Sequence, residues 1–281
     1  MTSFINDSTG PSRLSFSSSE GELHSFLHCT MAEAALSEAL TWHEAPLGSA
    51  LMSSTESELA EAVCSSRSVI IVPDFCTPEE VTLLVKAGVR AAEQQQQNPL
   101  TSSESRFRIE VFGRRLISNG VTLTSLDRDV QVLATDLVYR ALDLIQSRNP
   151  ALADGMRISG CTADTRLSYS AGEPAINVYY APGGDFKPHR DMQSLTLLVS
   201  LSPLTDYEGG GTHFYEPAAT PSEAIRGKAV PIATLRQPAG AALLWGGELT
   251  HAAAAVTKGR RLVFVASVTP QDVEDILRGS V

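Results

Sequence analysis

From about residue 160 onward, the chain is a series of short apolar segments separated by turns that contain Gly and Pro. These segments read AINVYY, SLTLLVSL, THFY, AVPIATL, AALLW and RLVFVASV. Short strands at this density form a sandwich or a closed barrel, because each apolar face must be covered by another sheet. The sequence therefore predicts a β-barrel core over residues 160–270.

Helices are expected before the barrel. Val69-Ile70-Ile71-Val72 has the pattern of a buried strand, and Thr77-Pro78-Glu79-Glu80 then forms a capping box that starts a helix. A second amphipathic pattern runs from about Leu126 to Ile145 and is stopped by Asn149-Pro150. We expect this helical support, residues 77–148, to pack outside the barrel, which makes the fold class α+β and mainly β.

The first part of the chain has a different composition. Residues 1–65 are predicted to be a Ser-rich, largely disordered leader with two short helices, AEAALSEAL and ESELAEAV. The sequence leaves open whether these helices dock on the core. The ordered domain is expected to span residues 66–281.

Composition restricts the partners. The chain has 281 residues and a formal net charge of −10 without a Lys/Arg run, which argues against nucleic acid as a partner. No apolar run approaches the roughly 18–20 residues that span a membrane, and the N-terminus lacks the apolar stretch of a secretory signal. We expect a cytoplasmic protein, with a nuclear location possible, no membrane partner, and four reduced cysteines. The oligomeric state is not readable.

The segment Tyr180-Ala-Pro-Gly-Gly-Asp-Phe-Lys-Pro-His189-Arg-Asp191 carries two candidate metal ligands. His189 and Asp191 are two residues apart, which puts both side chains on one face of a strand. A third ligand must come from elsewhere, and His251 is the candidate. Two histidines and one carboxylate leave three coordination positions open, which suits non-haem Fe(II) oxygenases. An HxD motif alone also arises by chance, so its context matters.

An arginine provides that context. Arg261 opens the apolar segment RLVFVASV and Arg260 comes directly before it; consecutive residues of a strand point to opposite faces, so one of the two arginines can face solvent. A guanidinium inside a barrel needs an anionic partner, and a dicarboxylate could supply one. We favour Arg261 as the inward residue.

These motifs resemble the double-stranded β-helix core of 2-oxoglutarate oxygenases of the prolyl 4-hydroxylase and lysyl hydroxylase type. The similar segment runs from Tyr180 to Val268. It includes the following stretches: Thr196-Leu-Leu-Val199, Asp206-Tyr-Glu-Gly-Gly-Gly211, Gly-Glu-Leu-Thr-His251 and Gly259-Arg-Arg261. The resemblance implies a jelly-roll or cupin-like barrel that uses 2-oxoglutarate and O2 to hydroxylate a C–H bond, with release of succinate and CO2.

The resemblance also implies roles for residues. The Fe(II) ligands would be His189, Asp191 and His251, and Arg261 would bind the far carboxylate of 2-oxoglutarate. Thr212 matches a residue beside that carboxylate. Tyr180 matches a tyrosine that hydrogen-bonds the co-substrate, although an ordinary core tyrosine is the alternative. Ascorbate is expected as the reductant.

Three other residue groups receive structural interpretations. His213 should point away from Thr212 on a strand, so we do not expect it to bind metal. Trp245 is interpreted as barrel core, and Gly209 to Gly211 as a tight hairpin.

The substrate remains open. Prolyl hydroxylases of this type carry an Arg and a Trp linked to peptide binding where this chain has Gln193 and Ser267, and the loop from Asp191 to Thr196 is short. The sequence leaves three hypotheses. We place first a hydroxylase of a protein or peptide side chain. The alternatives are a hydroxylase of a small molecule, such as an amino acid or natural product, and a catalytically silent binding barrel. Hydroxylation and demethylation are not distinguished.

Overall fold

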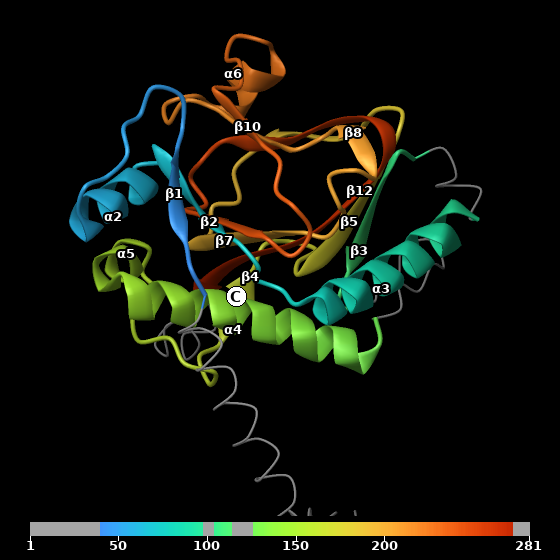
Figure 1. The fold of residues 1–281 in the computed structure, drawn as a ribbon, viewed down its shortest axis with the longest axis horizontal. Helices are drawn as coiled ribbons and strands as arrows, with labels where there is room; N and C mark the ends of the chain where they lie inside the picture. Colours follow the sequence, from blue (N-terminus) through green and yellow to red (C-terminus); the bar gives the residue numbers. More distant parts are fainter. Residues whose placement is uncertain (1–39, 98–103, 114–125, 272–281) are drawn as a thin grey trace, which may run out of the picture.

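The computed structural model describes residues 40–97, 104–113 and 126–271, and it contains a closed, mainly antiparallel β-barrel with helices on one side (Figure 1). All strand pairs in the described part of the chain are antiparallel. The strands are β1 (His43–Pro46), β2 (Ser68–Val72), β3 (Arg106–Glu110), β4 (Leu167–Tyr169), β5 (Ala175–Tyr180), β6 (Gly184–His189), β7 (Leu195–Ser200), β8 (Tyr207–Gly209), β9 (Thr212–Phe214), β10 (Ala233–Leu235), β11 (Ala242–Trp245) and β12 (His251–Pro270).

The long strand β12 closes the barrel. Its C-terminal part lies between β5 and β7 in the large sheet, whose order is β1-β2-β11-β7-β12-β5-β3. Its N-terminal part pairs with β6, β8 and β9, which form the opposite wall with β10. One strand therefore belongs to both walls, and the prediction of a mainly β, double-stranded β-helix fold is confirmed.

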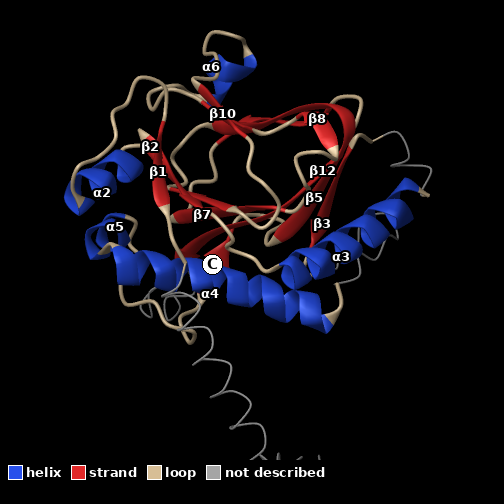
Figure 2. Cartoon of the chain, viewed as in Figure 1, coloured by secondary structure: helices blue, strands red, loops and turns tan. Residues whose placement is uncertain are grey.

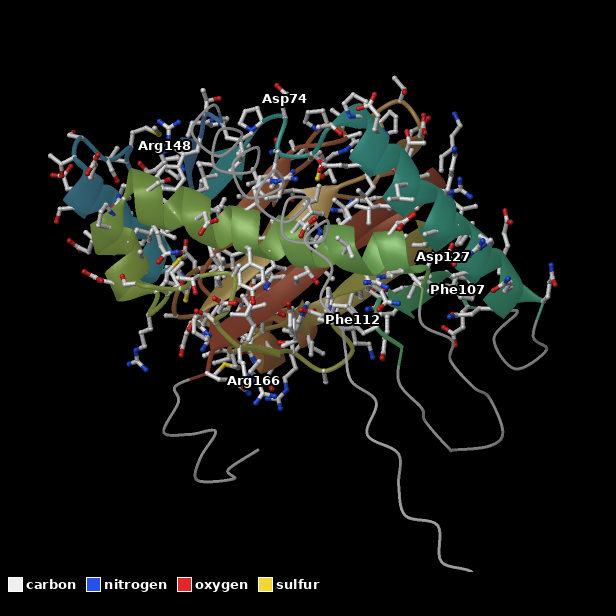
Figure 3. The ribbon with its side chains drawn as sticks, turned by 90° about the horizontal axis from the view of Figure 1, so that it is seen from below. Asp74, Phe107, Phe112, Asp127, Arg148 and Arg166 are labelled. Carbon is white, nitrogen blue, oxygen red and sulfur yellow. The ribbon has the colours of Figure 1, made fainter. Side chains whose placement is uncertain are left out.

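Two long helices cover the outer face of the large sheet. They are α3 (Pro78–Gln96) and α4 (Arg128–Arg148), and both lie on the same side of the barrel (Figure 2). Seen from that side, α4 lies across the strands with α3 beside it (Figure 3). The apolar faces of helices and sheet meet in one core, which includes Leu84, Leu137 and Ile176. No helix in the described ranges is both long and apolar enough to cross a membrane.

The predicted capping box does start α3 and also links the two helices. Glu80 accepts from the backbone N–H of Thr77, and the Thr77 hydroxyl accepts from the N–H of Glu80. The same carboxylate accepts two hydrogen bonds from the buried Arg140 of α4, at 2.7 and 3.0 Å. Burial by itself would raise the pKa of Glu80, but these hydrogen bonds and the charge of Arg140 outweigh it, so the pKa is lowered.

The region assigned to the leader is partly integrated into the barrel domain. The predicted helix ESELAEAV forms α2 (Glu56–Cys64), which packs against α5 (Pro150–Gly155). Before it, β1 pairs with β2, so a boundary between residues 65 and 66 would separate two hydrogen-bonded strands. The sequence missed β1 because HEAP has no strand pattern and becomes a strand only through its partner. The expected helix AEAALSEAL lies almost wholly outside the described residues.

The cysteines that the structure describes are reduced. Cys64 is exposed, whereas Cys76 and Cys161 are buried, and none of the three forms a disulfide within the described residues. Burial raises the pKa of the Cys76 thiol to about 12, so this thiol stays protonated and unreactive.

Candidate metal centre

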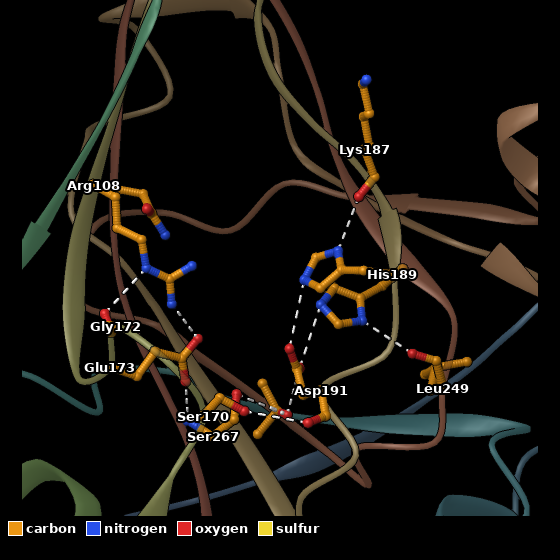
Figure 4. Close-up of polar contacts among 12 residues, drawn as sticks. Arg108, Ser170, Gly172, Glu173, Lys187, His189, Asp191, Leu249 and Ser267 are labelled. Atoms are coloured by element: carbon orange, nitrogen blue, oxygen red, sulfur yellow. Dashed lines mark hydrogen bonds and ion pairs between the residues drawn. The ribbon is translucent and has the colours of Figure 1, made fainter. Parts of the chain in front are cut away.

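The three predicted metal ligands converge at one end of the barrel. His189 ends β6 and His251 begins β12, and the two residues are directly opposite each other across this strand pair. Asp191 follows β6 and reaches between them, with Oδ1 and Oδ2 each 3.5 Å from the Nε2 of one imidazole. The candidate ligand atoms of the three residues all lie within 4.8 Å of one another (Figure 4). Two imidazole nitrogens and a carboxylate oxygen on one side of a divalent ion match this spacing.

Backbone carbonyls and a hydroxyl hold these ligands in place. The Nδ1 of His189 lies 2.9 Å from the Lys187 carbonyl, and the Nδ1 of His251 lies 3.0 Å from the Leu249 carbonyl. A carbonyl only accepts, so Nδ1 must carry the proton in both rings and Nε2 faces the centre unprotonated. The Thr196 hydroxyl donates to Oδ2 of Asp191 at 2.7 Å. Such partners orient ligands and raise metal affinity.

A turn before β12 fixes the loop that carries Asp191. The backbone N–H groups of Asp191 and Met192 both donate to the carbonyl of Gly247, at 3.1 and 3.0 Å. A Cβ at Gly247 would lie only 2.3 Å from the carbonyl oxygen of Gln193, so the close approach requires glycine. The loop after the first histidine is thereby attached to the segment that leads into the second.

The protonation states suit a metal site. Burial lowers the pKa of His251 to about 4, so this imidazole is neutral at neutral pH. Burial alone would raise the pKa of Asp191, but the neighbouring imidazoles of His251 and His189 and the Thr196 hydroxyl outweigh it, and the pKa is lowered. An ionised carboxylate beside a neutral imidazole is the form in which these groups bind metals.

A buried arginine lies in the same cavity. Arg261 on β12 is only 3% exposed, and its guanidinium donates to the Thr212 hydroxyl at 3.3 Å. Within the described parts of the chain, no carboxylate forms an ion pair with Arg261. An unpaired buried guanidinium is costly, so its position favours an anionic ligand beside it.

The structure resolves which of the two consecutive arginines faces the cavity. Arg261 lines it, whereas Arg260 lies on the opposite face of β12, 5.9 Å from the ring of Tyr180. The cavity is narrow: the centre of a water molecule can occupy about 40 Å³ of it, within a hollow of about 410 Å³ that includes the part open to solvent. Its walls include the three candidate metal ligands, Thr212 and Arg261.

Tyr180 is not part of the cavity, contrary to the expectation from the sequence. It lies opposite Arg260 and packs edge-on against Phe107 on the helix side, and its hydroxyl is buried without a hydrogen-bond partner among the described residues. Tyr179 lines the cavity instead, directly opposite Arg261. Successive residues of a strand face opposite sides, so a displacement of one position exchanges the two tyrosines. The pairing of Tyr179 with Arg261 is the signal that identifies the inward residue.

The other expectations concern neighbouring residues. His213 points away from the cavity and forms a hydrogen bond with Thr234 at 2.7 Å. Trp245 is fully buried in the barrel, with its ring 4.9 Å from that of His251. Gly209, Gly210 and Gly211 all have positive φ, as a tight connection requires.

Sequence reasoning missed one wall of the cavity, which carries Arg108, Glu173 and Asn177. Arg108 comes from β3 and Asn177 from β5, and the two residues are directly opposite each other. The alternation of Arg106, Arg108 and Glu110 with apolar residues in RFRIE could have indicated a polar inner face.

The fold and this site define a closed antiparallel barrel with a His-Asp-His centre and a buried arginine. Comparisons with protein-family models and with curated proteins find no match. Solved structures that the chain resembles include α-ketoglutarate-dependent enzymes, prolyl hydroxylases and a 2OG-Fe(II) oxygenase family protein. They include a carbocyclase from nogalamycin biosynthesis described as non-haem and α-ketoglutarate-dependent (12% identity, 84% of this chain and 94% of that chain, TM-score 0.46). A second is a Pseudomonas putida prolyl-4-hydroxylase (11% identity, 78% of this chain and 100% of that chain, TM-score 0.42). A third is a Trichoplax adhaerens prolyl hydroxylase in complex with a hypoxia-inducible-factor peptide (12% identity, 76% of this chain and 90% of that chain, TM-score 0.41).

Proposed function

We propose that this protein is an Fe(II)- and 2-oxoglutarate-dependent dioxygenase that hydroxylates a C–H bond. The observation that carries the proposal is the convergence of His189, Asp191 and His251 next to a buried, unpaired Arg261. In the balanced reaction, substrate C–H, O2 and 2-oxoglutarate give substrate C–OH, succinate and CO2. Bound Fe(II) would supply the redox chemistry of this reaction.

The donor set fits Fe(II). Its two imidazoles and one carboxylate leave three coordination positions free, which a bidentate co-substrate and O2 require. The protein holds each donor rigid: Lys187 and Leu249 fix the rings, and Thr196 fixes the carboxylate. A site with fixed donors needs little reorganisation when it binds the ion.

The co-substrate would bind with its far carboxylate on Arg261. Thr212 would donate a second hydrogen bond to that carboxylate, since its hydroxyl already lies 3.3 Å from the guanidinium. Tyr179 takes the place that Tyr180 was expected to occupy, because its side chain shares the inner face with Arg261. The burial of Arg261 excludes water there and strengthens binding of an anion.

For the substrate, we favour a small molecule over a protein side chain. The two positions linked to peptide binding in prolyl hydroxylases are occupied by side chains with other contacts. Gln193 accepts a hydrogen bond from Thr269 at 2.6 Å, and Ser267 is fully buried. Neither offers the cation or the aromatic ring that would hold a peptide backbone.

The test is the conversion of 2-oxoglutarate into succinate by the purified protein with Fe(II) and ascorbate. We expect slow conversion without substrate and its loss in His189→Ala. The matched control is His213→Ala, which removes a histidine from a neighbouring strand that faces away from the cavity. If His189→Ala converts 2-oxoglutarate as fast as the control, the metal assignment is wrong. Bound iron without succinate formation in the wild type would instead support a silent binding barrel.

A further inference from the structure

The cavity has a second polar end, formed by Arg108, Asn177 and Glu173. In Figure 4, Arg108 and Glu173 lie across the cavity from His189 and Asp191. This end is separate from Arg261: on the inner face of β5, Asn177 is two residues before Tyr179, which corresponds to roughly 7 Å along a strand. The cavity therefore has polar side chains at both ends: Arg261 at one, and the cluster of Arg108, Asn177 and Glu173 at the other.

The guanidinium of Arg108 is held in a fixed orientation. Its Nε donates to the Gly172 carbonyl at 3.1 Å, and its Nη2 donates to Glu173 at 2.7 Å. Glu173 is itself fixed, because its second oxygen accepts from the backbone N–H of Ser267 at 2.5 Å and its side chain is only 4% exposed. No hydrogen bond to a described residue uses the remaining nitrogen, Nη1.

Asn177 presents a second donor. Its Oδ1 accepts a hydrogen bond from Arg106 at 3.2 Å, which assigns the NH2 group to the other side of the amide. That NH2 group has no hydrogen-bond partner among the described residues, although Asn177 is only 5% exposed and lines the cavity. Asn177 lies directly opposite Arg108, and both side chains line the same cavity, so their free N–H groups share one wall of it.

One cation beside this end has no carboxylate partner in the described residues. Arg108 is paired with Glu173, but within the described ranges no carboxylate forms an ion pair with Arg106. Asp185 acts on Arg106 electrostatically but is exposed and beyond ion-pair distance. Arg106 lies 3.8 Å above the ring of Phe186, and that ring packs on His189. One phenyl ring thus separates an unpaired cation from the metal centre.

We infer that Arg108 and Asn177 bind the carboxylate of a small organic acid, and that this acid is the substrate. Two adjacent N–H donors match the two oxygens of a carboxylate, and the positive charge of Arg106 favours an anion over a neutral carbonyl. The acid would lie between Arg108 and the metal, with 2-oxoglutarate on Arg261 at the other end. This inference rests on the proposed function and adds the substrate class to it.

The experiment measures binding without turnover. The full-length protein is loaded with Mn²⁺ in place of iron and saturated with isotope-labelled 2-oxoglutarate. It is then mixed with a deproteinised small-molecule extract of cells, and molecules retained at equilibrium by ultrafiltration are identified by mass spectrometry. A second portion of the extract is first methyl-esterified, which removes free carboxylates. Arg166→Gln, at an exposed arginine outside the cavity, is the matched control.

We expect the wild type and Arg166→Gln to retain the same carboxylic acid besides 2-oxoglutarate, and only from the untreated extract. In Arg108→Gln this retention should weaken about 10- to 100-fold, the range expected when one charged hydrogen bond is lost. Because Arg108→Gln leaves Glu173 unpaired, the double variant Arg108→Gln/Glu173→Gln serves as a second test without a buried lone charge. Asn177→Asp should abolish retention through repulsion.

Four results would overturn the inference. The first three are retention of a compound without a carboxylate, equal retention by the Arg108 variants and the control, and retention of nothing besides 2-oxoglutarate. The fourth is retention of peptides through a free C-terminus, which would contradict a small-molecule substrate. A wild type that fails to retain the labelled 2-oxoglutarate would refute the proposed function itself, so the two failures are distinguishable.

Discussion

Replacing Arg261 by methionine should make the ligand-free protein more stable and remove its response to 2-oxoglutarate. The reason is that Arg261 is 3% exposed and has no carboxylate partner within the described residues, so folding has to bury a charge that only the co-substrate would neutralise. Methionine has a similar length and fills the same space without a charge. Stability and function are therefore opposed at this position.

The size of the effect follows from the burial. Replacing buried charged groups by apolar residues of similar volume stabilises proteins by about 1–4 kcal/mol. For a chain of this size, 1 kcal/mol corresponds to about 2–4 °C, so Arg261→Met should raise Tm by about 2–16 °C. A ligand at a hundred times its Kd stabilises the protein it binds by about 2.7 kcal/mol, which would raise the wild-type Tm by about 5–10 °C.

The assay is thermal unfolding of wild type and variant with Mn²⁺, each with and without 2-oxoglutarate. We expect the variant to melt higher than the wild type without 2-oxoglutarate and to be unchanged by its addition. Thr212→Val is the comparison, since it removes one hydroxyl but leaves the guanidinium, and its response should be reduced rather than lost. A variant that is less stable than the wild type and still responds fully would refute the role given to Arg261.

Three further predictions concern substitutions at other positions. Tyr179→Phe should weaken 2-oxoglutarate binding about tenfold in a titration, whereas Tyr180→Phe, on the other face of β5, should leave it unchanged. Quenching of tryptophan fluorescence by Co²⁺ should disappear in Trp245→Phe, because the ring of Trp245 lies 4.9 Å from that of His251, whereas the other tryptophan, Trp42, packs against the core between the helices and the large sheet. Glu80→Gln should cost about 3 kcal/mol in urea unfolding at neutral pH by leaving Arg140 unpaired. Since the pKa of Glu80 is lowered by folding, this cost should shrink as pH falls through the acidic range, and a constant cost would contradict the pairing.

Much of the architecture could be predicted because its signals are local. The capping box at Thr77 and the amphipathic repeat after Leu126 predicted α3 and α4, whose observed bounds are Pro78–Gln96 and Arg128–Arg148. Turn residues between short apolar segments predicted the barrel. In each case the period of the sequence and the geometry of the element agree, so neighbouring residues suffice.

The bounds of the strands, and which of their side chains point into the barrel, were harder to predict from the sequence. RLVFVASV predicted a strand from Arg261, but β12 begins at His251, so the segment AAAAVTK continues the same strand. Small residues carry little strand preference and become a strand here through pairing with β6, β8 and β9. Irregular register along these pairs also changes which residues face inward.

The sequence by itself determined the kinds of residue from which a metal and a diacid could be bound: two histidines, one carboxylate and one arginine beside an apolar strand. Only the tertiary structure decided which tyrosine faces Arg261 and that Arg108 and Asn177 form the opposite wall. The physical reason is that facing depends on register, and register is set by pairing between segments far apart in the chain. A shift of one residue, as with Tyr179 and Tyr180, leaves the composition unchanged and moves the hydroxyl to the other side of the sheet.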